Sequence, residues 1–230
     1  MNLLGKIGSA LLTNLHSKKY DSFEIFRDIQ LRDSAETFSK PMTESTLIRD
    51  KTKLHEYVLL ETLRNCSQED NGIFAEFGVH NGGSINGFTR ILQRYNKKIY
   101  GFDSFEGIEE NWKIDVLKGV LNRNGKPPVE GPNVELLIGK AQDTLPGFIK
   151  KNVNSYFSFI HLDMDTYTPT KFTLEILKPF LKKNSVILFD ELHGYETWKT
   201  NEYKALNEVL SVSDYKYIAF GTQQAAIQIL

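Results

Sequence analysis

The chain has 230 residues, a formal net charge of −1 and a single cysteine, Cys66. This length fits one α/β domain with a short extension, and 40% apolar residues can form a sizeable core. The small net charge gives no general attraction to nucleic acid, and no apolar run reaches the about 18 residues of a membrane span. A single cysteine excludes a disulfide framework and a cysteine-rich zinc site. The low cysteine content and the lack of a signal-peptide pattern predict a cytoplasmic protein.

Residues 1–50 are predicted to form a helical N-terminal extension. Apolar residues recur there near helical spacing, at Leu3, Leu4, Ile7, Leu11 and Leu15. We expect this amphipathic helix to pack on its own domain or on a partner subunit. Membrane association is the alternative, which the small number of lysines disfavours. A second apolar stripe, from Leu54 to Leu63, predicts a helix that begins the main domain, residues 51–230.

From Ile73 onward, short apolar runs alternate with helical patterns. The predicted strands are Ile73–Phe77, Lys98–Phe102, Val134–Ile138, Phe157–Leu162, Ser185–Phe189, Tyr215–Ala219 and Ala225–Ile229. The predicted helices between them include Ser84–Tyr95, Thr144–Lys150 and Pro169–Leu181. This alternation predicts an α/β fold with a doubly wound, mostly parallel, seven-stranded sheet. The last two strands are too close in sequence for a parallel crossover, which predicts a C-terminal antiparallel hairpin.

A stretch rich in glycine and proline, from Glu106 to Pro132, interrupts the alternation. A connection of this length within a compact domain is usually functional or disordered. The sequence leaves two interpretations open for residues 106–132, a lid that faces the substrate or a simple insertion.

The segment Glu76–Gly83 (EFGVHNGG) joins the first of these strands to a predicted helix. Glycine lets the backbone pass close to a charged ligand, and a helix N-terminus offers free N–H groups to an anion. The spacing E-x-G-x-x-x-G differs from the G-x-G-x-x-G of dinucleotide sites. The cofactor-binding residues predicted here are Glu76, Gly78, Gly82, Gly83 and Ser84. Tight packing of the turn is the alternative reason for its glycines.

The next predicted strand leads into an acid, Asp103, placed where a ribose diol would be bound. A helix N-cap is its alternative role. Ser104 follows it, and Ala141 and Gln142, after the third strand, are expected to border an adenine. Together with the terminal hairpin, these positions favour S-adenosylmethionine as the cofactor.

Carboxylates follow the fourth and fifth predicted strands, at Asp163, Asp190 and Glu191. Neighbouring strand ends meet at the ligand crevice of a doubly wound sheet, so we expect these acids to gather beside the cofactor. Three oxygen ligands suit Mg²⁺ or a similar divalent cation, which can lower the pKa of a bound hydroxyl. Helix capping and salt bridges are the alternative.

The candidate catalytic residues are Asp163, His161 and His193, and Asp163 is also expected to contact the cofactor. A histidine with a pKa near neutrality suits proton removal, although a structural role or a substrate contact remains open for both histidines. Tyr167 is a further substrate-binding candidate, and His80 is expected to contact ligand or solvent.

Six segments together resemble the macrocin O-methyltransferase family, which methylates sugar hydroxyls on macrolides. They are Met42–Leu54 (MTESTLIRDKTKL), Phe74–Ser84 (FAEFGVHNGGS), Tyr100–Gly107 (YGFDSFEG), Asp143–Pro146 (DTLP), His161–Tyr167 (HLDMDTY) and Val186–Glu191 (VILFDE). The resemblance implies a class I methyltransferase with a Rossmann-like fold, S-adenosylmethionine, Mg²⁺ dependence and a homo-oligomer. By motif, the metal ligands would be Asp163, Asp190 and Glu191. The family has two adjacent aspartates where this chain has Asp190-Glu191.

The sequence therefore predicts an S-adenosylmethionine-dependent O-methyltransferase. Its expected acceptor is a small molecule or glycan, through a hydroxyl of a sugar or glycosylated compound, with help from a divalent metal. A metal-dependent glycosyltransferase is one alternative, because Asp163-Met164-Asp165 is a D-x-D pattern after an apolar strand. A non-catalytic binding protein with the same fold is the other alternative.

Overall fold

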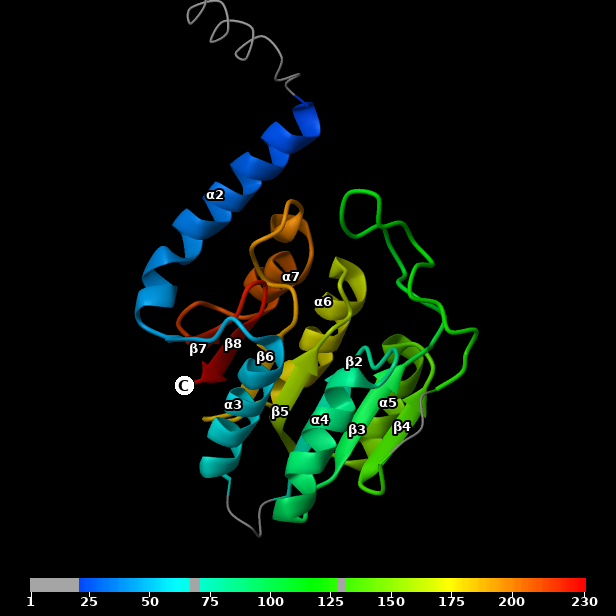
Figure 1. Cartoon of the computed structure of the whole chain (residues 1–230). Helices are drawn as coiled ribbons and strands as arrows, with labels where there is room; N and C mark the ends of the chain where they lie inside the picture. Colours follow the sequence, from blue (N-terminus) through cyan, green and yellow to red (C-terminus); the bar gives the residue numbers. More distant parts are fainter. Residues whose placement is uncertain (1–20, 67–70, 128–130) are drawn as a thin grey trace, which may run out of the picture.

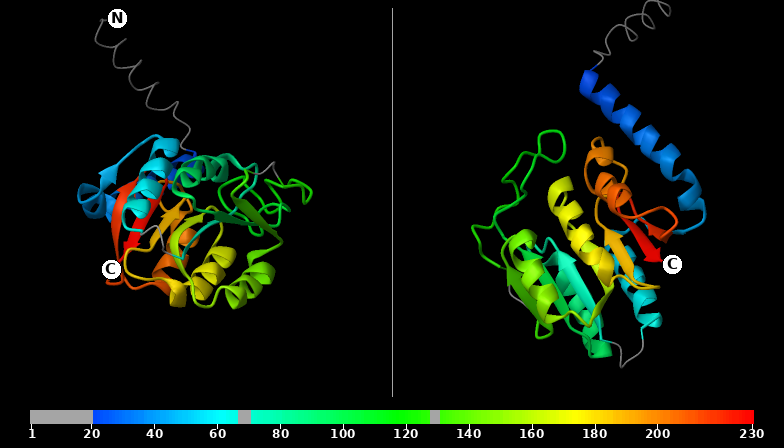
Figure 2. Two further views of the ribbon diagram at one scale, coloured as in Figure 1. Left: turned by 90° about the horizontal axis from the view of Figure 1, so that it is seen from below. Right: turned by 180° about the vertical axis from the view of Figure 1, so that it is seen from behind.

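The computed structural model describes residues 21–66, 71–127 and 131–230. These residues form a central sheet covered by helices on both faces (Figures 1 and 2). The amphipathic helix predicted from Leu3 to Leu15 lies outside the described residues. None of the described helices is long and apolar enough to cross a membrane.

The sheet has the strand order β1-β7-β8-β6-β5-β2-β3-β4. Its strands are β1 Thr46–Leu47, β2 Gly72–Phe77, β3 Ile99–Asp103, β4 Val134–Ile138, β5 Tyr156–Leu162, β6 Val186–Phe189, β7 Tyr215–Phe220 and β8 Ala225–Ile229. Among the described strands, only β8 runs antiparallel to its neighbours, β6 and β7. The predicted doubly wound sheet with a terminal antiparallel hairpin is therefore confirmed.

The sheet formed by the described residues has eight strands, one more than the seven predicted. The additional strand is β1, which pairs in parallel with β7 through Thr46–Ala219 and Leu47–Phe220. Two residues are too few to show the apolar periodicity from which strands are predicted. Residues 46–47 of the predicted extension thus belong to the sheet.

Two layers of helices bury the faces of the sheet. The helices are α2 Ser22–Thr43, α3 Lys51–Arg64, α4 Gly83–Leu92, α5 Ala141–Lys151, α6 Tyr167–Leu177 and α7 Glu202–Val209, with 3₁₀ turns at η1 Gln93–Tyr95, η2 Lys178–Phe180 and η3 Trp198–Thr200. On one face, α3 and α4 pack Leu54 and Phe88 against strand residues such as Phe159. On the other, α5, α6 and α7 contribute Phe148, Leu174 and Leu206 to the second core. The helices that frame the strand ends are thus held by buried apolar contacts.

The long helix α2 packs on the body mainly through its C-terminal half, and its exposed first turns extend beyond the body (Figure 1). Phe38 is buried against the rings of Trp198, Tyr203 and Phe220. The hydroxyl of Ser34 accepts a 2.9 Å hydrogen bond from the Gly194 N–H. The helix therefore supports the segment that follows β6.

The connection between β3 and β4 contains no helix or strand among its described residues, 104–127 and 131–133. It folds back on itself through hydrogen bonds of 3.0 Å from Ile108 N to Val120 O and from Gly119 N to Ile108 O. The carbonyl of Trp112 accepts a 2.8 Å bond from the Thr197 hydroxyl. The loop is thereby joined to the same segment that α2 supports.

Candidate functional site

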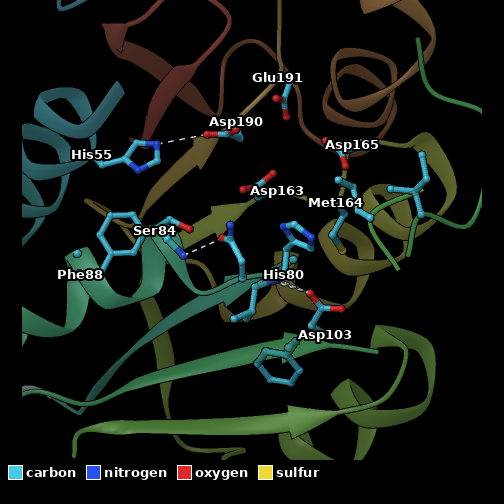
Figure 3. Close-up of a pocket in the computed structure, with 18 of the residues that line it drawn as sticks. His55, His80, Ser84, Phe88, Asp103, Asp163, Met164, Asp165, Asp190 and Glu191 are labelled. Atoms are coloured by element: carbon cyan, nitrogen blue, oxygen red, sulfur yellow. Dashed lines mark hydrogen bonds and ion pairs between the residues drawn. The ribbon is translucent and has the colours of Figure 1, made fainter. Parts of the chain in front are cut away.

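A cavity of about 870 Å³ lies at the carboxyl ends of β2, β3, β5 and β6 (Figure 3). Its walls include nine of the residues predicted from sequence: Gly78, Gly83, Ser84, Asp103, Ser104, Ala141, Asp163, Asp190 and Glu191. Glu76, Gly82, Gln142, His161 and His193 are not part of the walls. The volume falls within the usual range of roughly 300–1,000 Å³ for small-molecule sites.

The turn after β2 depends on Gly78 for a packing reason. Its φ is +90°, and a Cβ atom at this position would lie 1.7 Å from the carbonyl oxygen of Asp163. A side chain would therefore collide with backbone at the end of β5. Gly82, with φ of +77°, is the N-cap of α4 and brings the helix N-terminus, Gly83 and Ser84, to the cavity wall.

Asp103 holds the glycine turn in place. Its Oδ2 accepts hydrogen bonds from the backbone N–H groups of Val79 at 2.8 Å and His80 at 2.7 Å. Its Oδ1 accepts one from Phe105 N at 2.6 Å. The carboxylate lies in the cavity wall beneath His80 (Figure 3). It therefore fixes the loop while presenting negative charge to a ligand.

Glu76 lies behind the turn, fully buried. It accepts a 2.9 Å hydrogen bond from the Ser84 hydroxyl and lies 3.3 Å from Nδ1 of His161. Burial raises the pKa of Glu76, and the contacts with His161 and Ser84 act against this increase. In this geometry Glu76 connects the start of α4 to the histidine at the end of β5.

His161 lies between two carboxylates. Its Nε2 is 3.5 Å from Oδ1 of Asp190, while its Nδ1 faces Glu76. Burial lowers the pKa of His161, but Asp190 and Glu76 outweigh burial and raise the pKa to about 10. The ring is therefore protonated at neutral pH, which suits charge balance rather than proton removal.

Asp190 is further neutralised from α3. Its Oδ2 forms an ion pair with Lys51, and its Oδ1 lies 3.3 Å from Nε2 of His55. Burial alone would raise the pKa of Asp190, but the ion pair with His161, the hydrogen bond with His55 and the charge of Lys51 hold it well below its usual value. Burial lowers the pKa of His55 to about 4.

Lys51 and His55 were not predicted from sequence. Both line the cavity, and their spacing of four residues places them on one face of α3. That spacing, within a segment rich in polar residues, was the available signal. The sequence did not indicate that this face of α3 meets the end of β6.

Glu76 and Asp190, with the cations around them, form a first group of charged residues. The remaining acids of the cavity wall form a second group. Asp163, Asp165 and Glu191 each offer an oxygen, and these oxygens lie within 4.8 Å of one another. Figure 3 shows their side chains around a common space. Burial and the neighbouring carboxylates raise the pKa of all three. Glu191 Oε2 is buried and forms no hydrogen bond with any described residue.

The predicted metal set of Asp163, Asp190 and Glu191 is thus distributed over two groups. The second group contains Asp165 in place of Asp190. The fully buried Glu202 lies beside it and accepts a 3.2 Å hydrogen bond from the Glu191 N–H. Negative charge is therefore concentrated on one side of the cavity, and no lysine of the described segments forms an ion pair with these acids.

His193 and Tyr167 lie apart from the cavity wall. The His193 ring packs against Phe38 and Phe220, and its Nε2 is 3.1 Å from the Gln224 carbonyl. Burial lowers its pKa to about 4. The Tyr167 hydroxyl donates a 2.6 Å hydrogen bond to Glu208. Neither side chain is positioned to reach a ligand in the cavity as the structure stands.

The region that contains this site matches a known family. A family model described as "Methyltransferase domain" matches residues 75–192, just over half of the chain. The chain belongs to this methyltransferase family. The matched range runs from β2 to the residue after Glu191 and so includes both acid groups. This methyltransferase has the S-adenosylmethionine-binding fold, as predicted, whereas the narrower macrocin resemblance stays a prediction.

Solved structures show the same fold. The calicheamicin methyltransferase CalS11 aligns with a TM-score of 0.63 and 20% identity, over 99% of this chain and 93% of that chain. The O-methyltransferase NovP aligns with a TM-score of 0.56 and 19% identity, over 78% of this chain and 79% of that chain. No curated protein sequence matches the chain significantly.

Proposed function

We propose that this methyltransferase transfers the methyl group of S-adenosylmethionine to a hydroxyl of a sugar or of a glycosylated small molecule. The observation that carries the proposal is the position of Asp163, Asp165 and Glu191 in the same cavity as the glycine turn. Two structures of one enzyme with a similar fold, the calicheamicin methyltransferase CalS11, support a sugar-bearing acceptor, because CalS11 is described as a TDP-rhamnose 3'-O-methyltransferase. Oxygen ligands around the acceptor suit a hydroxyl because they can hold a metal or accept its proton.

The cavity residues fit S-adenosylmethionine. Gly83 and Ser84, at the N-terminus of α4, would bind its carboxylate, and Asp103 with Ser104 would bind the ribose. Ala141 would border the adenine. When bound, the sulfonium supplies an electrophilic methyl group.

The second acid group also fits a divalent cation. Asp163, Asp165 and Glu191 are oxygen ligands at compatible spacing, and Glu191 Oε2 lacks a hydrogen-bond partner among the described residues. A cation there would offset the repulsion that raises their pKa values and would lower the pKa of an acceptor hydroxyl. Asp190 would then act through charge balance with Lys51 and His161.

The chain's own residues would prepare the acceptor. Ile108 and Trp112 of the β3–β4 connection and Met164 add apolar surface to the cavity wall, which limits water around the acceptor. Asp163 would hold the cation or, where no cation is bound, would accept the hydroxyl proton, since burial and the neighbouring carboxylates raise the pKa of its carboxyl. Orientation by these walls would supply much of the rate.

Calorimetry with S-adenosylmethionine tests this proposal, with Mg²⁺ and with chelator in parallel. We expect binding by the wild type and at least about tenfold weaker binding by Asp103→Asn, since the glycine turn loses its charged anchor. Asp28→Asn, on the exposed face of α2, is the matched control and should bind normally. Absence of binding under both conditions would remove the cofactor assignment.

Transfer to the acceptor needs a separate measurement. Mass spectrometry should detect a gain of one methyl group on a sugar hydroxyl in a panel of glycosylated acceptors. Methylation only of nitrogen or carbon acceptors would contradict the proposed chemistry while leaving the cofactor assignment intact. The D-x-D glycosyltransferase alternative has no separate support, since its acids fall within the methyltransferase match.

A further inference from the structure

The cavity extends beyond the glycine turn along two helices. α3 and α4 lie side by side on one face of the sheet (Figure 1). On the α4 side, the wall continues from Gly83 and Ser84 to Gly87, Arg90 and, in the following 3₁₀ turn, Arg94. These positions recur every three or four residues, so they lie along one stripe of the helix.

The two arginines are distant from the expected cofactor carboxylate. With a rise of about 1.5 Å per residue, Arg90 lies about 9 Å along α4 from Ser84, and Arg94 lies farther still. The α4 N-terminus already provides N–H groups for an anion near Ser84. The arginines therefore face a more distant part of any bound molecule.

Gly87 leaves room in the cavity between the α4 N-terminus and the two arginines. A glycine inside a helix costs about 1 kcal/mol relative to alanine. No packing constraint accounts for it, since a Cβ atom at position 87 would meet nothing within 4 Å. Because Gly87 lines the cavity, the missing side chain widens the passage toward Arg90.

Neither arginine is neutralised within the described part of the chain. Arg27 and Arg64 form ion pairs with glutamates three residues away, whereas no hydrogen bond or ion pair joins Arg90 or Arg94 to a described residue. Glu56, the carboxylate that α3 adds to this wall, pairs with neither.

The helix dipole accounts for these arginines only in part. A cation in the last helical turn is favoured by the dipole, which explains one positive charge. Two like charges four residues apart repel by a few tenths of a kcal/mol. An anionic ligand would remove that repulsion.

We propose that Arg90 and Arg94 bind a phosphate or diphosphate group carried by the sugar acceptor. Guanidinium groups bind phosphate oxygens through paired, planar hydrogen bonds, and two of them one turn apart match a diphosphate. The sugar then lies over Gly87 toward the acid group, and its charged end lies between α3 and α4. This inference rests on the proposed function, because it assigns a charge to the acceptor of the same site.

Calorimetry on the full chain with inorganic pyrophosphate tests the inference. We expect Arg90→Gln/Arg94→Gln to bind pyrophosphate at least tenfold more weakly than the wild type. The control Arg27→Gln/Arg64→Gln removes the same charge outside the cavity and should bind it as the wild type does. Arg90→Lys/Arg94→Lys should recover only part of the affinity, because lysine lacks the planar fork.

Two further probes identify the source of the diphosphate. Uridine diphosphate carries the group on a nucleoside, and geranyl diphosphate carries it on a lipid chain. The probe with the lower Kd shows which of these two kinds of acceptor the cavity prefers. Equal pyrophosphate affinity in the wild type and in Arg90→Gln/Arg94→Gln overturns the inference.

S-adenosylmethionine binding, measured on the same proteins, separates the two proposals. It should be unchanged in Arg90→Gln/Arg94→Gln. Loss of cofactor binding in this variant, with pyrophosphate binding intact, would assign the arginines to the cofactor and overturn the inference. Failure of the wild type to bind the cofactor would instead remove the proposed function.

Discussion

Two groups of carboxylates lie side by side at the end of the sheet, and the protein treats them differently. Asp190 and Glu76 enclose a protonated His161, and Lys51 and His55 complete the first group. Asp163, Asp165 and Glu191 form the second group, whose pKa values are raised by burial and mutual repulsion. The first group is balanced by the chain's own cations, whereas no ion pair joins a cation of the described residues to the second group.

The largest effect on stability is expected at His161, the centre of the first group. Replacing His161 with glutamine removes a buried cation between two buried carboxylates, so we expect a loss of about 3–5 kcal/mol in the free energy of unfolding. Urea denaturation measures this loss. His193→Gln is the matched control, since His193 is also buried but neutral and should cost less. Equal losses in the two variants would mean that His161 contributes packing rather than charge.

The second group should respond to metal. If Asp163, Asp165 and Glu191 bind Mg²⁺, a concentration of 100 times the Kd should add about 2.7 kcal/mol to the free energy of unfolding. Asp165→Asn should lose this stabilisation, while Asp28→Asn should keep it. Thermal unfolding with Mg²⁺ and with chelator measures the difference. An unchanged midpoint in the wild type would end the metal proposal and leave the cofactor proposal standing.

The pH dependence of stability should reveal the proton on His161. The pKa of His161 is raised from 6.5 to about 10 on folding, so its contribution to stability is complete below pH 6.5. That contribution is lost as the pH rises from 6.5 toward 10, by at most about 1.4 kcal/mol per pH unit. Urea denaturation in chelator should show the wild type losing this advantage over His161→Gln. A constant difference across this window would contradict the assignment.

The smallest effect on stability is expected at Lys51, at the exposed edge of the first group. The Lys51 side chain is half exposed, so Lys51→Met should cost only about 1 kcal/mol even though its partner Asp190 is buried. Lys98→Met, which removes an exposed pair with Glu135, is the control and should cost less. A loss as large as that of His161→Gln would show that Lys51 contributes as much positive charge to this group as His161 does.

Much of the fold follows from local patterns. The apolar runs that became β2 to β8 each carry enough residues to be recognised, and the short link before Ala225 requires a hairpin. Thr46–Leu47 is different, because its strand exists only through pairing with β7. The glycine turn was also predictable, and the structure adds that the Asp163 backbone leaves no room for a side chain at Gly78.

In the candidate site, too, some features follow from the sequence and others only from the tertiary structure. By itself, the sequence determined that Asp103, Asp163, Asp190 and Glu191 follow strands, and parallel strands bring such ends to one edge. Only the tertiary structure decided which carboxylate is neutralised, because Lys51 and His55 reach Asp190 across 139 and 135 residues of chain. A pKa depends on burial and on charges close in space, and neither can be read from spacing along the chain.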